Sequence, residues 1–83
     1  MFHILFTRKG QKDIEKLPLL IQKRIQDKLL DYAQCKNPLT FAKPLINLPP
    51  ATHRFRVGKY RISFFIQGST IFVERVELRG EAY

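Results

Sequence analysis

Residues 53–61, which read HRFRVGKYR, alternate apolar and basic side chains on both sides of a glycine. Strict alternation is typical of a β-strand that has two different faces. The pair Gly58-Lys59 suits a two-residue turn, because glycine readily adopts the backbone conformation that such turns require. The segment therefore predicts a tight antiparallel hairpin in which Arg56 lies directly opposite Arg61.

One face of this hairpin carries positive charge. Arg54 and Arg56 share that face with Arg61, whereas the apolar side chains point the other way. Like charges directly opposite each other cost roughly 0.2–1 kcal/mol, and a bound anion would relieve the repulsion. A half-exposed strand also needs some polar side chains, and a single arginine would fit that purely structural interpretation. Three arginines with no acid between them favour a face that binds an anion.

The kind of anion follows from the chemistry of the side chains. Guanidinium groups present planar forks of donors that suit phosphate oxygens, so this surface could hold a nucleic-acid backbone. The candidate RNA-binding residues are Arg54, Arg56, Lys59 and Arg61. The whole chain has a formal charge of +8 and a pI of about 10.1, which fits nucleic acid, an acidic protein or an anionic membrane surface.

The region 11–36 changes from a period of two to a helical period. Pro18 suits the first turn of a helix and not its interior, so we expect two helices, at about 9–16 and 18–36. Their shared apolar stripe consists of Ile14, Leu17, Ile21, Ile25, Leu29 and Tyr32 or Ala33.

The remaining apolar segments predict an antiparallel meander. Strands are expected at 52–57, 60–67 and 70–77, with a further short strand at 45–48. An N-terminal strand at 2–6 is apolar on both faces, which favours an interior position in the sheet. Helices followed by strands predict a two-layer α+β domain in which the helical stripe covers one face of the sheet.

Length and cysteine content limit the possible architectures. Residues 1–83 are enough for one small domain. Cys35 is alone, and His3 and His53 lie far apart in the sequence, so we expect no disulfide, no metal and no cofactor.

The N-terminal sequence indicates the expected compartment. The apolar run 1–6 meets Arg8 after too few residues for a signal peptide. No segment approaches the roughly 18–20 apolar residues that span a bilayer. We therefore expect a cytoplasmic protein with no membrane partner.

Few residues could carry acid–base catalysis. No Ser-His-Asp or Cys-His arrangement follows from the spacing, and the carboxylates after Asp31 are Glu74, Glu77 and Glu81. An enzyme of this kind would work mainly with Arg and Tyr. Such chemistry is possible on RNA, whose 2′-hydroxyl can attack the adjacent phosphate once the groups are aligned and the phosphoryl charge is neutralised. Arginine neutralises charge well, but a pKa above about 12 makes it a poor general base.

The C-terminal tail adds Arg79 and Tyr83. If the strand period continued from Ile71 and Val73, Arg79 would share their face. The chain must therefore bend or bulge near Glu77 before Arg79 can join the arginine face. Tyr83 is either a frayed end or a side chain that stacks on a base.

Over nearly its whole length the sequence resembles the RelE/ParE superfamily of type II toxins. The matching segments are the strand 2–6, DIEKLP at 13–18, Leu45, RFRVGKYRI at 54–62 and RVELRGEAY at 75–83. The resemblance implies a RelE-like fold and a small toxin that a cognate antitoxin holds inactive. RelE-like members enter the ribosomal A site and cut mRNA, leaving a 2′,3′-cyclic phosphate. ParE-like members inhibit DNA gyrase, and a catalytically inactive binding module of the same fold is a further alternative.

The resemblance also implies roles for individual residues. Arg54 and Arg56 would bind phosphate and help to activate the 2′-hydroxyl, and Arg61 would stabilise the transition state. Arg79 would protonate the leaving oxygen, and Tyr83 would stack on an mRNA base. Arginines at 54 and 56 replace family lysines, which keeps phosphate affinity but weakens a proton-acceptor role. Leu78 stands where many relatives have histidine.

Overall fold

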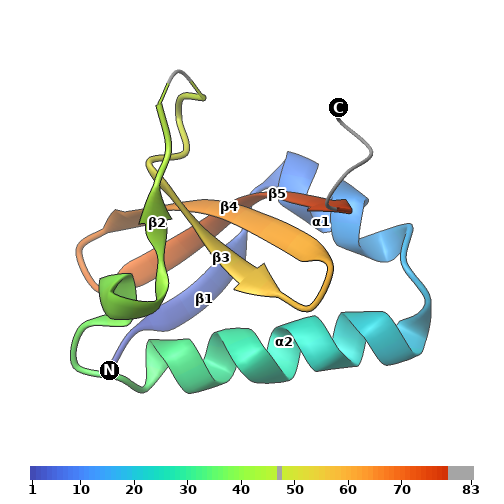
Figure 1. The fold of residues 1–83 in the computed structure, drawn as a ribbon, viewed down its shortest axis with the longest axis horizontal. Helices are drawn as coiled ribbons and strands as arrows, with labels where there is room; N and C mark the ends of the chain where they lie inside the picture. The colour runs from blue at the N-terminus through green and yellow to red at the C-terminus, as the bar shows by residue number, and fades with distance from the viewer. Residues whose placement is uncertain (47, 79–83) are drawn as a thin grey trace.

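The computed structural model describes residues 1–46 and 48–78, which form two layers, one of helices and one of strands (Figure 1). The described strands make a sheet of order β1-β5-β4-β3-β2, in which β1 is parallel to β5 and the other neighbours are antiparallel. The elements are β1 (His3–Phe6), α1 (Arg8–Glu15), α2 (Leu19–Ala33), the 3₁₀ helix η1 (Pro38–Phe41), β2 (Lys43–Pro44), β3 (His53–Val57), β4 (Tyr60–Gln67) and β5 (Thr70–Leu78). The predicted α+β class and the antiparallel meander are confirmed.

Thr7 fixes the start of α1 and holds it close to β5. Its Oγ1 accepts a hydrogen bond from the Gly10 backbone N–H at 3.1 Å and donates one to the carbonyl oxygen of Val73 at 3.2 Å. A Cβ at Gly10 would collide with that same carbonyl oxygen. Glycine is therefore required for α1 to approach the strand this closely.

Prolines set the limits of α2. Pro18 occupies its N-cap with φ −55°, where the missing N–H costs no helical hydrogen bond, so the predicted break between the helices is confirmed. The helix ends at Ala33, three residues before the predicted end at 36. Pro38 disfavours helical backbone at the residue before it, and Asn37 is extended with φ −132°. No helix in the described ranges is long and apolar enough to cross a membrane.

The helical stripe packs against one face of the sheet, along which α2 runs in Figure 1. The Tyr32 ring stacks on Phe55 with centroids 4.5 Å apart, and Phe55 stacks on Phe64 at 4.2 Å. The predicted stripe is confirmed. Its buried members are Ile14, Ile25, Leu29, Tyr32 and Ala33, and Leu17 and Ile21 are partly buried.

Two glycines at positive φ allow the two tight hairpin turns. Gly58 and Gly68 both have φ +59°, a region that favours glycine. Val57 pairs with Tyr60 across the first turn, as expected for a loop of two residues. The predicted register of the β3–β4 hairpin is therefore confirmed.

The interior position predicted for the first strand is wrong. In the described sheet, β1 lies at an edge and pairs only with β5. Leu5 is 53% exposed, so the apolar character of the outer face does not reflect burial. A parallel pair needs a long crossover connection. After β1, the helices α1 and α2 carry the chain to the opposite edge of the sheet, where β2 lies, and the meander then returns to β5 beside β1.

The short strand predicted at 45–48 is also wrong for the residues of that range that the structure describes, because the pairing occurs earlier, at β2. Lys43 pairs with Arg54 on β3, and the chain then leaves the sheet. After β2, the Leu45 N–H donates to the carbonyl oxygen of Thr52 at 2.9 Å. Ile46 is already 83% exposed, consistent with a loop.

Candidate functional site

The β3–β4 hairpin positions three arginines on the face of the sheet opposite to its buried apolar side chains. Arg56 lies directly opposite Arg61, and Arg54 lies opposite Ser63. The alternating neighbour Phe55 is fully buried, so the arginines project away from the core. The predicted grouping of the three arginines on one face is confirmed.

These arginines meet at a cavity of about 130 Å³, which we call the arginine cavity. Its described lining consists of Phe41, Lys43, Arg54, Arg56 and Arg61. The volume is several times the roughly 30 Å³ that one water occupies and smaller than the roughly 300 Å³ at which drug-sized sites begin. It suits a group of the size of a phosphate.

Positive charge dominates the arginine cavity. None of its described lining residues is an acid. Arg56 and Lys43 are exposed, and Arg54 and Arg61 are half-buried. A phosphate would gain charge-assisted hydrogen bonds from several donors at once.

Two lining residues were missed by sequence reasoning. Lys43 reaches the cavity because β2 places it directly opposite Arg54. Phe41 lies two residues earlier, and the extended backbone of Ala42, with φ −116° and ψ 158°, lets Phe41 and Lys43 project to the same side. The sequence could have indicated that Phe41 and Lys43 lie on the same side of an extended segment, because they are two residues apart. It could not have indicated that a strand as short as β2 pairs with β3.

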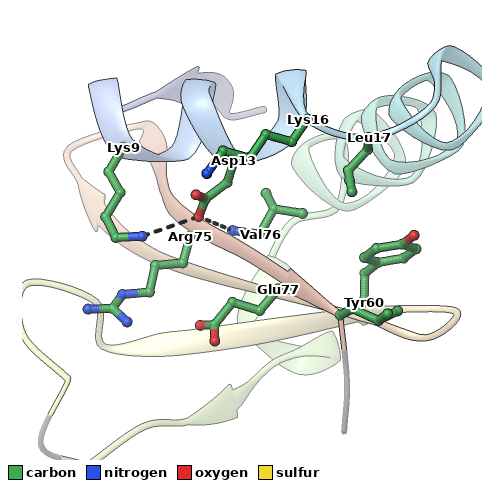
Figure 2. Close-up of a pocket in the computed structure, with 9 residues that line it drawn as sticks. Lys9, Asp13, Lys16, Leu17, Tyr60, Arg75, Val76 and Glu77 are labelled. Atoms are coloured by element: carbon green, nitrogen blue, oxygen red, sulfur yellow. Dashed lines mark hydrogen bonds and ion pairs between the residues drawn. The ribbon is translucent and has the colours of Figure 1, made fainter. Parts of the chain in front are cut away.

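The β4–β5 register brings two further charges to the arginine face. A register shift leaves Glu74 without a cross-strand partner, and beyond it Arg75 lies opposite Ser63 and Glu77 opposite Arg61. Figure 2 shows Arg75 and Glu77 projecting away from α1. An acid absent from the hairpin sequence therefore lies beside Arg61, and an additional arginine extends the face.

Lys59 is the remaining predicted residue that the structure describes, and it does not line the arginine cavity. Lys59 is in the turn and lines a hollow on the α2 side of the hairpin together with Arg24. Arg79 and Tyr83 lie outside the described residues. The irregularity predicted near Glu77 occurs at Glu74, three residues earlier.

A broader groove lies between α2 and the hairpin, and we call it the α2 groove. It consists of two hollows, of about 580 and 370 Å³, which share Arg24 and Val57. Leu20 lines the first hollow and is 73% exposed. The described charged residues around the groove are the cations Lys23, Arg24, Lys28 and Lys59 and the acid Asp27, whose Oδ2 lies 3.4 Å from Lys23 Nζ.

A third hollow, of about 510 Å³, lies between α1 and β5 (Figure 2). Asp13 Oδ2 accepts hydrogen bonds there from the Val76 backbone N–H at 3.1 Å and from Lys9 Nζ at 3.4 Å. Pairing of β1 with β5 ends at Val73, so Asp13 satisfies a backbone donor on the edge that β1 leaves uncovered. This mixed-charge hollow has a structural explanation and is a weaker candidate than the arginine cavity.

Tyr32 supports the rim of the arginine cavity from the core. Its ring stacks on Phe41 with centroids 5.1 Å apart. Burial raises the pKa of Tyr32, and the nearby Asp31 and Cys35 raise it further, so the phenol is neutral near pH 7.

In the described part of the chain, no three His, Cys, Asp or Glu side chains gather as metal ligands would.

Comparison with known proteins identifies relatives of the whole chain. The chain is 35% identical over 83 residues to the toxin RelE3 of Methanocaldococcus jannaschii, covering 96% of this chain and 93% of that protein. The toxin–antitoxin complex RelBE2 of Mycobacterium tuberculosis has a chain that matches with a TM-score of 0.78 and 28% identity, over 94% of this chain and 98% of that one. A chain of the ParDE system of Pseudomonas aeruginosa matches with a TM-score of 0.71 and 15% identity, over 95% of this chain and 97% of that one. At this identity the match shows the fold alone. No family model matches.

Proposed function

This chain belongs to the RelE/ParE superfamily of toxins of toxin–antitoxin systems, and on that basis we propose that it is an endoribonuclease that cuts mRNA on the ribosome. The observation that carries this proposal is the arginine cavity, in which three guanidinium groups and Lys43 surround a space of phosphate size. Several guanidinium groups around such a space are suited to a phosphodiester.

In the proposed reaction the 2′-oxygen of one nucleotide attacks the adjacent phosphorus. The bond from phosphorus to the 5′-oxygen of the next nucleotide breaks, giving a 2′,3′-cyclic phosphate and a 5′-hydroxyl end. Arg54, Arg56 and Arg61 would neutralise the charge that builds on the phosphoryl oxygens. The guanidinium groups of Arg54, Arg56 and Arg61 already carry their protons and cannot accept another, so a water, a substrate group or the ribosome would take the 2′-hydroxyl proton.

The tail would complete the site. By resemblance, Arg79 would donate the proton that the departing 5′-oxygen gains, and Tyr83 would stack on a base of the message. Lys59 would contact the RNA backbone only where the strand extends around the hairpin turn, because it lies away from the arginine cavity.

A primer-extension assay on translated mRNA tests the proposal. The purified protein should give discrete cuts, and Arg61→Ala should reduce their rate by roughly 10²–10³-fold, as expected when one donor to a transition-state oxyanion is lost. Arg8→Ala is the matched control, because Arg8 is exposed at the start of α1 and lines none of the hollows described above. Equal cutting by the Arg61 and Arg8 variants would contradict the proposed role.

Gyrase inhibition is the second candidate, because the fold also matches the ParDE chain. It predicts that supercoiling by DNA gyrase falls while translated mRNA stays intact. If both assays are silent while an antitoxin still binds, the chain is a catalytically inactive binding module.

We further propose a cognate antitoxin as the protein partner, held in part by the α2 groove. The RelBE2 neighbour is itself a toxin–antitoxin complex. An exposed leucine beside cations suits a segment that alternates apolar and acidic side chains, and Leu20, which lines the groove, is 73% exposed. The net charge of +8 also favours an acidic partner.

A further inference from the structure

We propose that Phe41 is a stacking platform for a nucleobase of the RNA whose phosphate occupies the arginine cavity. This inference rests on the proposed ribonuclease function and adds a residue that reads the base instead of the backbone. It concerns single-stranded RNA, whose bases are free to stack.

The position of Phe41 is the first observation. It is the last residue of η1, it is 52% exposed, and it is the aromatic member of a described lining that is otherwise cationic. Sites for single-stranded nucleic acid combine cations that follow the backbone with aromatic rings on which bases stack. The arginine cavity and Phe41 supply both parts within one small site.

The support of the ring is the second observation. Phe41 stacks on Tyr32 at 5.1 Å with an interplanar angle of 22°, and Tyr32 stacks in turn on the buried Phe55. Ala42, the next residue, packs against the core. The orientation of the Phe41 ring is therefore set by the core, so a base that stacks on it would lose little further side-chain entropy.

A purely structural role would make Phe41 a cover for Tyr32. In that case any apolar side chain of similar size would serve, and RNA bases would not sense the change. A stacking role instead requires an aromatic face, because stacking uses the π surface of the ring. The two roles therefore differ in what Phe41→Leu and Phe41→Trp should do.

Fluorescence of a new tryptophan gives a direct test, because the chain contains none. Phe41→Trp is titrated with a short single-stranded oligoribonucleotide and with an abasic ribose-phosphate oligomer of the same length. We expect the oligoribonucleotide to quench the tryptophan and the abasic oligomer to bind without quenching it. Leu39→Trp, on the same 3₁₀ helix but outside the described cavity lining, is the matched control and should not be quenched.

Affinity supplies the second measurement. Phe41→Leu should weaken binding of the oligoribonucleotide roughly 5- to 150-fold, the range that corresponds to the loss of one stacked base. Binding of the abasic oligomer should not change. If Phe41→Leu does not fold, as judged by circular dichroism, the tryptophan titration decides alone.

The outcomes separate this inference from the proposed function. If the oligoribonucleotide binds and Arg61→Ala weakens it, but Phe41→Trp is not quenched or Leu39→Trp is quenched equally, the inference is wrong and the ribonuclease proposal stands. If translated messages are cut but the free oligoribonucleotide does not bind, the inference is wrong and the ribonuclease proposal stands. If RNA neither binds nor is cut in translated messages, both are wrong.

Discussion

The two sides of the β3–β4 hairpin carry the same sign of charge in different surroundings. On one side, the arginine cavity is a space of about 130 Å³ between alternating guanidinium groups. On the other, the α2 groove is wider, at about 580 and 370 Å³, and includes exposed leucine. A small space among cations selects a compact anion, whereas a broad apolar surface with a charged rim selects a protein segment. Under the proposed function, one side of the hairpin would bind the RNA substrate and the other side would bind the antitoxin.

The largest effect is expected from a substitution in the core that both sides of the hairpin share. Phe55 is fully buried between Tyr32 and Phe64, so Phe55→Ala should lower the free energy of unfolding by about 3–5 kcal/mol through lost burial and a cavity. Denaturant unfolding measures the loss. Phe65→Ala, on the opposite and half-buried face, is the control and should cost clearly less. Equal losses of unfolding free energy would mean that the face packed against the helices does not contribute more to stability than the opposite face.

The next comparison separates two cations that lie on either side of the turn. Arg56→Ala should slow mRNA cutting roughly 10- to 100-fold, because it removes a charge-assisted contact to phosphate. Lys59→Ala should leave cutting nearly unchanged, because Lys59 lines the α2 groove. Primer extension on translated mRNA measures both. A larger effect at Lys59 than at Arg56 would place the RNA on the wrong side of the hairpin for this proposal.

The α2 groove is tested by placing an acid among its apolar side chains. Leu20→Asp should weaken antitoxin binding roughly tenfold, because it replaces apolar contact with a charge that also repels an acidic partner. Titration calorimetry with the protein encoded by the adjacent gene measures the affinity. Leu30→Asp is a matched control, since Leu30 is exposed on α2 but does not line the groove as described. Equal weakening by both variants would argue against the groove.

The smallest effect is expected at the turn that joins the two sides. Gly58→Ala should cost roughly 1 kcal/mol, since an L side chain is disfavoured at φ +59° while no atom would obstruct the new Cβ. Thermal unfolding should detect a modest decrease in Tm. Cutting and antitoxin binding should change little, because the register is also held by the strand pairs. A change of a few kcal/mol would show that the turn carries more of the fold than its contacts indicate.

Local chemistry explains which parts of the fold could be predicted. A two-residue loop with glycine at positive φ leaves one register for the strands beside it, so the pairing of Arg56 with Arg61 was readable. Pro18 likewise marks a helix start wherever the helix packs. The apolar outer face of β1 was misleading, because hydrophobicity reports the preference of a side chain and not the number of neighbours its strand has.

The alternation of residues by itself determined that three arginines share one side of a hairpin, because side-chain direction along a strand depends only on the backbone. Tertiary structure decided what surrounds them. Lys43 and Phe41 reach the cavity through the short β2 pairing, and Arg75 and Glu77 reach the arginine face through the register shift at Glu74. Those contacts join segments far apart in the chain, and their register depends on how the helices and strands pack together, which no local pattern encodes.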